Sequence, residues 1–306
     1  MASYAGQNEH QRALSKLYDQ LCYRFSRHEV WQDFIWMVAC AISNAVDKRF
    51  AEDREAQYMR IIQKYDEKER KVFPQLYGEI VNGMERYPGC DFLGELYMGL
   101  ELGNKYGGQF FTPYGLCQAM ARMEITQEVL DAEMARQGYI SINDCACGAG
   151  ATLVAAANEL RRMGFDYQRN TLFVAQDIDS TTALMCYIQL SLLGCAGYVV
   201  IGDTLAAPQT GHVLFGEASS RCWYTPMFYH EAWTVRRSIA KAREIFGAVG
   251  RKALKPVEAP EAQTDAGKPE PSSAHGGTEN PEESAPGFTV SVRKKNAGQI
   301  MFDFGG

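Results

Sequence analysis

The stretch that most constrains the fold is residues 139–152, which read Tyr-Ile-Ser-Ile-Asn-Asp-Cys-Ala-Cys-Gly-Ala-Gly-Ala-Thr. Apolar and polar residues alternate over the first five positions, and two glycines and an alanine-rich segment follow Asp144. This order predicts a strand, a tight turn and a helix. Ligands bind at such turns in α/β sheets, and Gly148 and Gly150 would let the main chain approach one closely. The same Gly-x-Gly pattern also occurs where a helix merely packs on a strand.

Two further strands are predicted over residues 171–175 and 198–201, with helices over 152–163 and 181–193. Each strand ends near an acidic residue, which is Asp144, Asp177 or Asp203 in turn. Three such strands with helices between them make half of a doubly wound α/β sheet. The charge of Asp144 favours a ligand with hydroxyls or a cationic group over a bare phosphate.

The acids after the second and third strands have candidate ligand-binding roles. Asp177 stands where a carboxylate can accept hydrogen bonds from ribose hydroxyls, and Asp203 stands where an acid can bond the exocyclic amine of adenine. A purely structural role for Asp177 is the alternative. Asp179 is expected either near the ligand or as the cap of the helix that begins near Ser180.

Residues 107–113 read Gly-Gly-Gln-Phe-Phe-Thr-Pro, upstream of the glycine loop. Together with Ala-Cys-Gly-Ala-Gly at 146–150, this segment resembles the N6-adenine DNA methyltransferases related to modification subunits of type I restriction-modification systems. The lead-in segment at 91–97 and the acids after the later strands also have counterparts in that family. The resemblance covers about residues 91–205.

The resemblance implies S-adenosylmethionine as cofactor, DNA as substrate and the methionine carboxylate and amine bound by the loop at 144–150. The implied cofactor-binding residues are Gln109, Phe110, Phe111, Thr112, Asp144, Ala146, Cys147, Gly148, Gly150, Asp177, Ile178 and Asp203. Independently of the resemblance, the Thr-Pro pair predicts a helix over 114–130 with Thr112 as its N-cap and Pro113 at its first position.

The acceptor half of the family's chemistry is missing from the sequence. An adenine amine is a poor nucleophile, and the family uses an Asn/Asp-Pro-Pro-Tyr/Phe tetrapeptide to accept its protons and to stack the flipped base. This chain has no such tetrapeptide, and Pro226 in Tyr-Thr-Pro-Met-Phe is its nearest counterpart, so the catalytic residues are unknown. The hypotheses are a DNA adenine-N6 methyltransferase whose catalytic loop has diverged or comes from a partner, a catalytically silent cofactor-binding DNA-associated or regulatory subunit, and a methyltransferase for another substrate.

The sheet is expected to be truncated. Each strand-helix unit takes roughly 25 residues, so residues 205–251 have room for one short strand at 212–215 and one helix at 227–249. An open edge strand needs a cover. The N-terminal helices, the aromatic segment at 223–233 and a second chain, in a homo- or hetero-oligomer, are the candidates.

The first hundred residues are predicted to be helical, because apolar residues recur three or four apart over 9–45 and a second, charge-rich helix is predicted over 47–70. Its charges form either a solvated face or a DNA-contacting face. The predicted organisation is a helical subdomain at 1–105, a cofactor domain at 106–251, a disordered acidic linker at 252–296 and a docking peptide at 297–306.

Composition limits the partners and the location. The chain has 306 residues, 46% hydrophobic content and a formal net charge of −6, which argues against a strong non-specific nucleic-acid binder acting alone. The nine cysteines form neither a disulfide framework nor a Cys-x-x-Cys zinc motif, so a reducing cytoplasm and no metal are expected. No leader is expected, since the first residues lack a charged-then-apolar pattern, and the apolar run at 30–42 is expected to be too short to cross a bilayer.

The C-terminal sequence after the acidic linker predicts a short recognition motif. Its Gln, apolar and aromatic residues resemble peptides by which bacterial DNA-processing proteins dock on the replication sliding clamp. The candidate docking residues are Gln299, Ile300, Phe302 and Phe304. The alternative is a tail that folds back on its own core.

Overall fold

The computed structural model describes residues 7–103, 111–209, 213–216, 218–253 and 299–301. Gln109 and Phe110 of the predicted cofactor site and Phe302 and Phe304 of the predicted docking peptide lie outside the described residues. Within the described ranges, no helix is both long enough and apolar enough to span a membrane.

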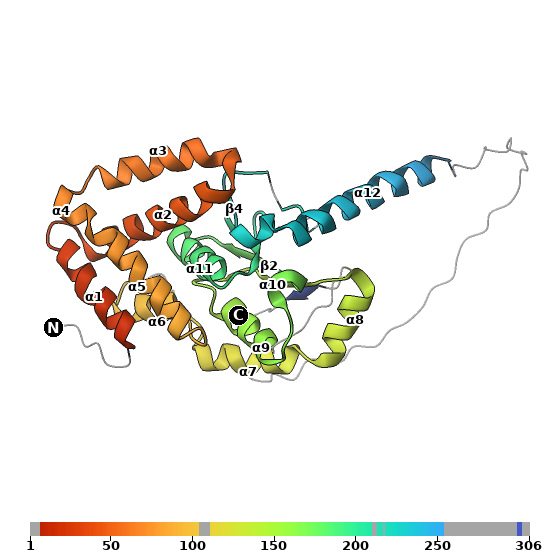
Figure 1. Cartoon of the computed structure of the whole chain (residues 1–306), viewed down its shortest axis with the longest axis horizontal. Helices are drawn as coiled ribbons and strands as arrows, with labels where there is room; N and C mark the ends of the chain where they lie inside the picture. The colour runs from red at the N-terminus through yellow and green to blue at the C-terminus, as the bar shows by residue number, and fades with distance from the viewer. Residues whose placement is uncertain (1–6, 104–110, 210–212, 217, 254–298, 302–306) are drawn as a thin grey trace, which may run out of the picture.

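The N-terminal part is helical, as predicted, and lies to one side of the sheet (Figure 1). Its elements are α1 (Glu9–Leu21), α2 (Arg27–Val46), η1 (Lys48–Phe50), α3 (Ala51–Ile62), α4 (Glu67–Arg70), α5 (Val72–Arg86) and α6 (Phe92–Gly99). The single helix predicted over 47–70 is wrong. Asp66 starts α4 by accepting from the backbone of Glu69, whose side chain in turn accepts from the N–H of Asp66, and this capping box ends any continuous helix.

The predicted helix over 114–130 is also two helices, α7 (Tyr114–Glu124) and α8 (Gln127–Gln137). The break falls at Ile125, which is extended, and at Thr126, whose side chain accepts a hydrogen bond from the N–H of Val129 and caps α8. Local capping chemistry therefore overrides an apolar spacing that runs through the break.

The sheet has five strands in the order β4-β3-β2-β1-β5. The three predicted strands are confirmed as β1 (Ile140–Asp144), β2 (Thr171–Asp177) and β3 (Ala196–Ile201), which pair in parallel. Three helices follow or connect them: α9 (Ala151–Arg162), α10 (Tyr167–Asn170) and α11 (Ser180–Leu192). The carboxyl ends of the three strands therefore meet at one edge of the sheet.

The strand predicted over 212–215 is wrong. Residues 213–215 form a turn, and the fourth strand is instead β4 (Cys222–Tyr224), antiparallel to β3. The turn covers one face of the sheet rather than extending its edge, because Leu214 is buried in the core and the carbonyl of Val213 accepts a 3.0 Å hydrogen bond from the hydroxyl of Tyr198.

Side chains of the central strands alternate between two hydrophobic layers. Phe173 and Ala175 of β2 pack in the layer that also contains buried residues of α2, α9 and α11. Leu172 and Val174 face the opposite layer, which is formed by the segment after β3 and by the start of α12 (Glu231–Ala253). Helices cover one face of the sheet, and an irregular aromatic segment covers the other.

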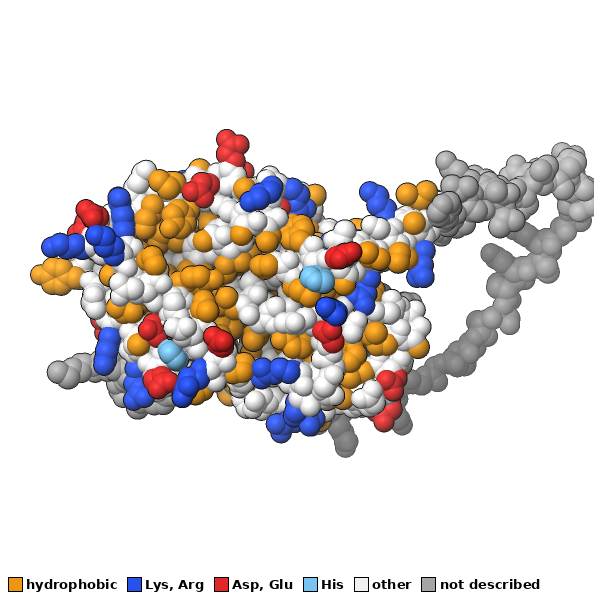
Figure 2. Space-filling model, viewed as in Figure 1, with side chains coloured by type: hydrophobic (Ala, Val, Ile, Leu, Met, Phe, Trp, Pro, Cys, Tyr) orange, Lys and Arg blue, Asp and Glu red, His pale blue; other side chains and the backbone are white. Residues whose placement is uncertain are grey.

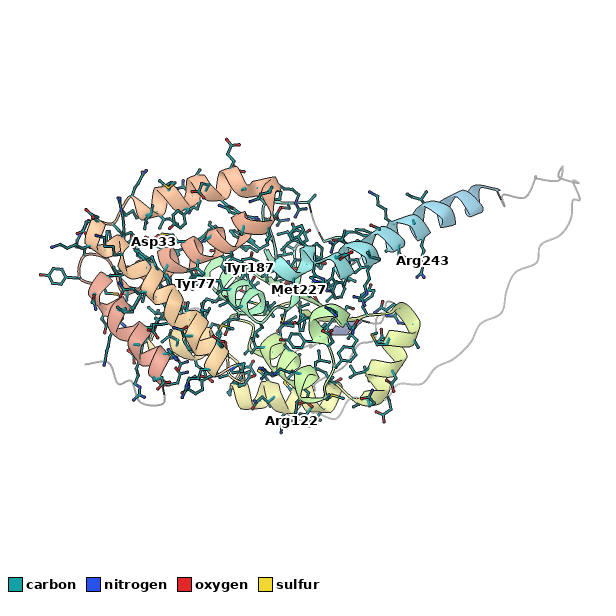
Figure 3. All side chains as sticks on the ribbon, viewed as in Figure 1. Asp33, Tyr77, Arg122, Tyr187, Met227 and Arg243 are labelled. Carbon is teal, nitrogen blue, oxygen red and sulfur yellow. The ribbon has the colours of Figure 1, made fainter. Side chains whose placement is uncertain are left out.

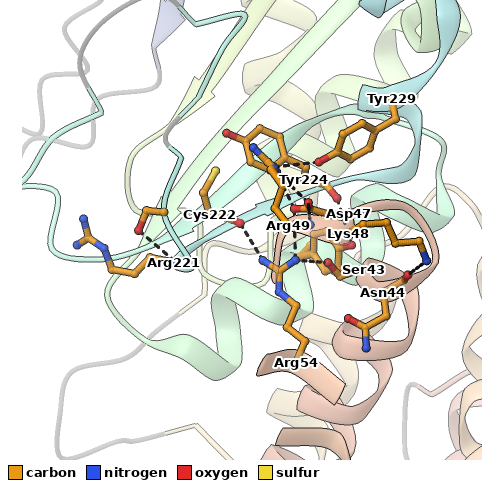
Figure 4. A network of polar contacts seen from close by, with 12 residues as sticks. Ser43, Asn44, Asp47, Lys48, Arg49, Arg54, Arg221, Cys222, Tyr224 and Tyr229 are labelled. Atoms are coloured by element: carbon orange, nitrogen blue, oxygen red, sulfur yellow. Dashed lines mark hydrogen bonds and ion pairs between the residues drawn. The ribbon is translucent and has the colours of Figure 1, made fainter. Parts of the chain in front are cut away.

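The three parallel strands β1, β2 and β3 have a further strand on either side, β5 beside β1 and β4 beside β3. Beside β1 lies β5 (Gln299–Met301), parallel and in the register Ser141 to Gln299. The N-terminal helices reach β4, where Arg54 donates a 3.0 Å hydrogen bond to the carbonyl of Cys222 (Figure 4). On α11, the buried Tyr187 donates to the carbonyl of Tyr224 and lies between these helices and the sheet (Figure 3).

The last long helix, α12, projects away from the rest of the fold (Figure 1). Basic and apolar side chains are both exposed along it, as Figure 2 shows, including Val235, Ile239 and Arg243. The helix continues to Ala253, two residues into the predicted acidic linker. Residues 254–298, which hold the rest of that linker, lie outside the described residues.

Candidate functional site

Hydrogen bonds join the loops at the carboxyl ends of β1, β2 and β3 into one unit. The N–H of Gly148 donates to Oδ2 of Asp177 at 2.7 Å, and the N–H of Gly202 donates to the carbonyl of Asp177 at 2.8 Å. The hydroxyl of Thr204 donates to the carbonyl of Cys145 at 2.5 Å. The three predicted acidic strand tips therefore lie at one site rather than scattered over the fold.

The backbone of the glycine loop donates its hydrogen bonds within the protein. Ala146 donates to Oδ1 of Asp144 at 3.1 Å, Cys147 to the carbonyl of Gln176 at 3.1 Å, and Gly150 to the carbonyl of Cys147 at 2.7 Å. With the bond from Gly148 to Asp177, four of the turn's donors are already used. A phosphate would need such N–H groups, so the loop instead suits a ligand that brings its own donors or a positive charge.

The glycines of the loop are required by geometry. Gly148 has a φ of +51°, and a Cβ there would lie 3.2 Å from the ring of Phe111. That ring is also stacked on Tyr97 of α6, with centroids 5.6 Å apart. Gly150 has a φ of +95°, and a Cβ there would lie 2.7 Å from Sγ of Cys186. The Phe-Phe-Thr-Pro segment thus meets the glycine loop at Phe111.

Asp144 is buried beneath the loop that it shapes. Its second oxygen accepts from the hydroxyl of Thr152, and its first accepts from Ala146. Burial raises the pKa of this carboxyl, and the bonds from Thr152 and Ala146 act in the opposite direction. Both oxygens of Asp144 hold the turn in place.

Asp177 is half-buried and keeps little spare acceptor capacity. Besides Gly148, it accepts from the N–H of Asp179 at 2.9 Å and from the hydroxyl of Thr182 at 3.4 Å. A carboxylate offers about four acceptor positions, so about one remains, on Oδ2, for a ligand hydroxyl. Burial raises the pKa of Asp177 despite these backbone bonds. Asp179 caps α11, as the alternative interpretation predicted.

Beyond β3, Asp203 is exposed and accepts from the N–H of Leu205 at 2.8 Å. Two large apolar side chains stand exposed at the same edge, Ile178 at 70% and Leu205 at 96% of their surfaces. The edge of the sheet thus offers carboxylates beside apolar surface, which is a combination suited to an adenosyl group.

The predicted N-cap at Thr112 is wrong. Pro113 precedes the first helical residue with a φ of −54° and a ψ of 131°, and α7 has no side-chain cap. The carbonyl of Pro113 accepts from Leu116 at 2.9 Å and takes the place of a capping side chain. Thr112 therefore has no structural role as a cap.

Sequence reasoning missed a buried amide that supports the site. Gln189 of α11 donates to Oδ1 of Asp91 at 2.7 Å and to the carbonyl of Ala149 at 2.9 Å, and it accepts from the N–H of Leu93 at 3.2 Å. It joins the lead-in helix to the glycine loop. The available signal was a long polar side chain in the middle of an otherwise apolar helix.

The segment around Pro226 lies at the opposite end of the sheet from the strand tips. The N–H of Thr225 donates to the carbonyl of Gly197, and its hydroxyl donates to the carbonyl of Cys195 at 2.7 Å. These partners stand at the start of β3, whereas Asp203 follows its last residue. Tyr-Thr-Pro-Met-Phe therefore cannot act on a ligand at the glycine loop.

Residues 91–237 match the family model of the N-6 DNA methylases. Over these residues the chain is similar to the N-6 DNA methylases. The family segment begins at Asp91 in the lead-in helix and includes all three strand tips and the β4 segment. No curated protein sequence matches the chain significantly.

Two solved structures are similar to this chain. One is a proposed class I S-adenosylmethionine-dependent methyltransferase from Listeria monocytogenes, at 18% identity and a TM-score of 0.37, with 68% of this chain and 58% of that chain covered. The other is a type I restriction-modification system methyltransferase subunit from Streptococcus thermophilus, at 16% identity and a TM-score of 0.32, with 71% and 46% covered. The chain spans about half the length of these two proteins.

Proposed function

We propose that the protein binds S-adenosylmethionine at the joined strand tips and acts as a DNA adenine-N6 methyltransferase-like protein. One observation carries the proposal. The N–H groups of the glycine loop already donate hydrogen bonds to the carboxylates of Asp144 and Asp177 and to the carbonyl of Gln176. Because the backbone donors of this loop are already bonded and carboxylates lie beside it, a ligand that brings positive charge and its own donors is favoured. S-adenosylmethionine does so through its ammonium group, its sulfonium and its ribose hydroxyls. The match of residues 91–237 to the N-6 DNA methylase family model supports DNA as the substrate.

The expected roles follow from position. Phe111 and the loop at 144–150 would hold the methionine part, and the remaining acceptor position on Asp177 would take one ribose hydroxyl. Ile178 and Asp203 would hold the adenine, by apolar contact and by a hydrogen bond to its amine. The cofactor would supply the methyl group, while these residues orient it.

Methyl transfer also needs groups that accept protons from the target amine. Since the Pro226 segment lies at the far end of the sheet, we expect those groups to come from a diverged loop elsewhere in the chain or from a partner. This observation favours a second candidate function, a cofactor-binding regulatory or DNA-associated subunit without catalysis of its own.

Incubation with radiolabelled S-adenosylmethionine and unmethylated bacterial DNA separates these two functions. Label in the DNA, absent with Asp177→Ala, is the result expected of an enzyme. Cofactor binding without label, repeated with candidate partner chains, would leave the silent subunit. Absence of cofactor binding would contradict both.

A sliding-clamp interaction through the C-terminal peptide is a further part of the proposal. Gln299 and Ile300 pair with β1, so docking elsewhere would require these residues to leave the sheet. Deletion of residues 299–306 should abolish capture of the protein by immobilised clamp. Unchanged capture would remove the clamp as a partner of this peptide.

A further inference from the structure

The outer edge of β1 is occupied by a strand that is short and distant in sequence. β5 has three residues and pairs in parallel with residues 141–143 of β1. On the other side of β1 lies β2, which has seven residues and pairs with β1 along its whole length. Few backbone hydrogen bonds therefore hold β5 in the sheet, compared with those that join β1 to β2.

A long stretch of chain separates β5 from the preceding helix. In Figure 1 the end of α12, at Ala253, stands apart from β5, the dark blue strand, and residues 254–298 lie between them in the sequence. A segment joined through a tether competes for its site with an effective concentration of at most about the millimolar range. A strand of another molecule that binds β1 more tightly than β5 can therefore replace β5.

Ser141 of β1 shows that β5 fits this edge incompletely. Ser141 stands opposite Gln299 in the register of the two strands. It is 1% exposed, and its hydroxyl has no hydrogen-bond partner in the part of the chain that the structure describes. A buried polar group left without a partner is destabilising. β5 thus covers β1 but leaves one of its polar groups unsatisfied.

The other outer strand of the sheet is held differently. All three residues of β4 are buried, and the guanidinium of Arg54 donates a 3.0 Å hydrogen bond to the carbonyl of Cys222. Arg54 belongs to α3, so the N-terminal helices fix β4 in place. The edge of β1 is therefore the one at which the structure favours exchange of a strand.

We propose that the outer edge of β1 is a strand-binding site for a partner protein, and that β5 occupies it until an extended segment of the partner replaces it. In such strand addition, main-chain hydrogen bonds give affinity and the fit of side chains gives specificity. Thr and Ser residues hydrogen-bond across neighbouring strands, so the partner segment carries a Thr or Ser opposite Ser141. A second copy of this chain would bring the same Gln299 and have no advantage over β5.

The test uses a fluorescein-labelled peptide with the sequence of residues 297–306, the same peptide with Gln299→Thr, and fluorescence anisotropy with the full chain. Ile300→Pro with Met301→Pro, made together in the chain, removes two adjacent N–H groups. One of the two faces β1, because successive N–H groups of a strand point to opposite sides, so β5 should leave the edge. This double variant should bind both peptides, and the Gln299→Thr peptide about fivefold more tightly, as one added hydrogen bond predicts.

The wild type should bind each peptide severalfold more weakly than the double variant, because β5 competes for the edge. Ser272→Pro with Ser273→Pro puts two prolines in the tail before β5 and should behave as the wild type. Hydrogen exchange locates the binding: the amides of residues 141–143 should exchange faster in the double variant and slow again when peptide is added.

Thermal unfolding checks that the variants fold. If the double variant does not, the wild type with excess peptide serves, since Gln299→Thr must still tighten binding. The inference would be overturned by absence of binding to the folded double variant, by equal binding to that variant and the wild type, by equal affinity of the two peptides, or by unchanged exchange at residues 141–143.

Discussion

At the scale of single residues, the burial of the Asp144 carboxylate predicts how the stability of the protein depends on pH. Its carboxylate is buried, and its pKa is raised because burial disfavours the charged form more than the bonds from Thr152 and Ala146 favour it. The folded protein therefore binds a proton at Asp144 more readily than the unfolded chain does. The contribution of Asp144 to stability grows as the pH falls through its folded pKa and is lost as the pH rises.

Asp144→Asn should remove this dependence. The free energy of unfolding of the wild type, measured by urea denaturation between neutral pH and about pH 4, should gain on that of the variant as the pH falls. Other acids titrate in both proteins, so the difference between the two curves is the relevant quantity. A constant difference over that range would contradict the burial argument.

Gly150→Ala should destabilise the fold by more than the backbone strain alone. A non-glycine residue at positive φ costs about 1–2 kcal/mol, and the new Cβ would also meet Cys186 at 2.7 Å, which adds about 1–3 kcal/mol of overpacking. Urea denaturation of the wild type and the variant measures the loss of unfolding free energy.

Gly164→Ala is the matched control for that substitution. Gly164 has a φ of +74°, and a Cβ added there would meet nothing within 4 Å, so only the strain applies. If Gly150→Ala and Gly164→Ala lost equal unfolding free energy in urea, the side chain of Cys186 would have moved aside at no energetic cost. That result would contradict the overpacking argument.

At the scale of elements, the N-terminal helices are attached to the sheet through a buried charge cluster. Burial alone raises the pKa of Asp47, but the hydrogen bonds from Arg49 and the charges of Arg49 and Arg54 lower it below its ordinary value. Arg54 is 4% exposed and reaches the carbonyl of Cys222 in β4. Asp47 therefore positions Arg54, which links the N-terminal helices to the sheet.

Asp47→Asn should cost about 3–5 kcal/mol of unfolding free energy at neutral pH, because it leaves Arg54 buried with a weaker partner. The loss should shrink as the pH falls through the lowered pKa of Asp47, where the wild type is protonated too. Urea denaturation measures both effects. Glu52→Gln, at an exposed position of α3, is the control, and an equal loss there would contradict the cluster's role.

The same scale shows which elements the sequence could predict. The three parallel strands and their helices follow from alternation and spacing that reflect burial on the two sheet faces. The breaks at Thr126 and Asp66 depend on caps within a continuous apolar pattern. The position of β4 depends on its pairing with Tyr198 and on Arg54, which are distant in sequence, so local patterns could not locate it. For the same reason Gln189 was missed at the site.

At the scale of the whole molecule, the proposed cofactor site has no counterpart for the acceptor side, because the sequence lacks the Asn/Asp-Pro-Pro-Tyr/Phe tetrapeptide. The strand tips, Phe111 and the glycine loop form one hydrogen-bonded and packed unit. The only Pro-aromatic segment in the described part of the chain after β3, at Pro226, lies at the other end of the sheet. A partner that completes the acceptor side is the arrangement we propose.

The central claim is that the strand tips form a cofactor site organised by Asp177, and isothermal titration calorimetry with S-adenosylmethionine tests it most directly. The wild type should bind the cofactor, and Asp177→Ala should bind it at least about tenfold more weakly, since a charged acceptor contributes about 1.5–3 kcal/mol. Asp179→Ala, which removes only the cap of α11, should retain most of the affinity. No heat of binding to the folded wild type would contradict the account.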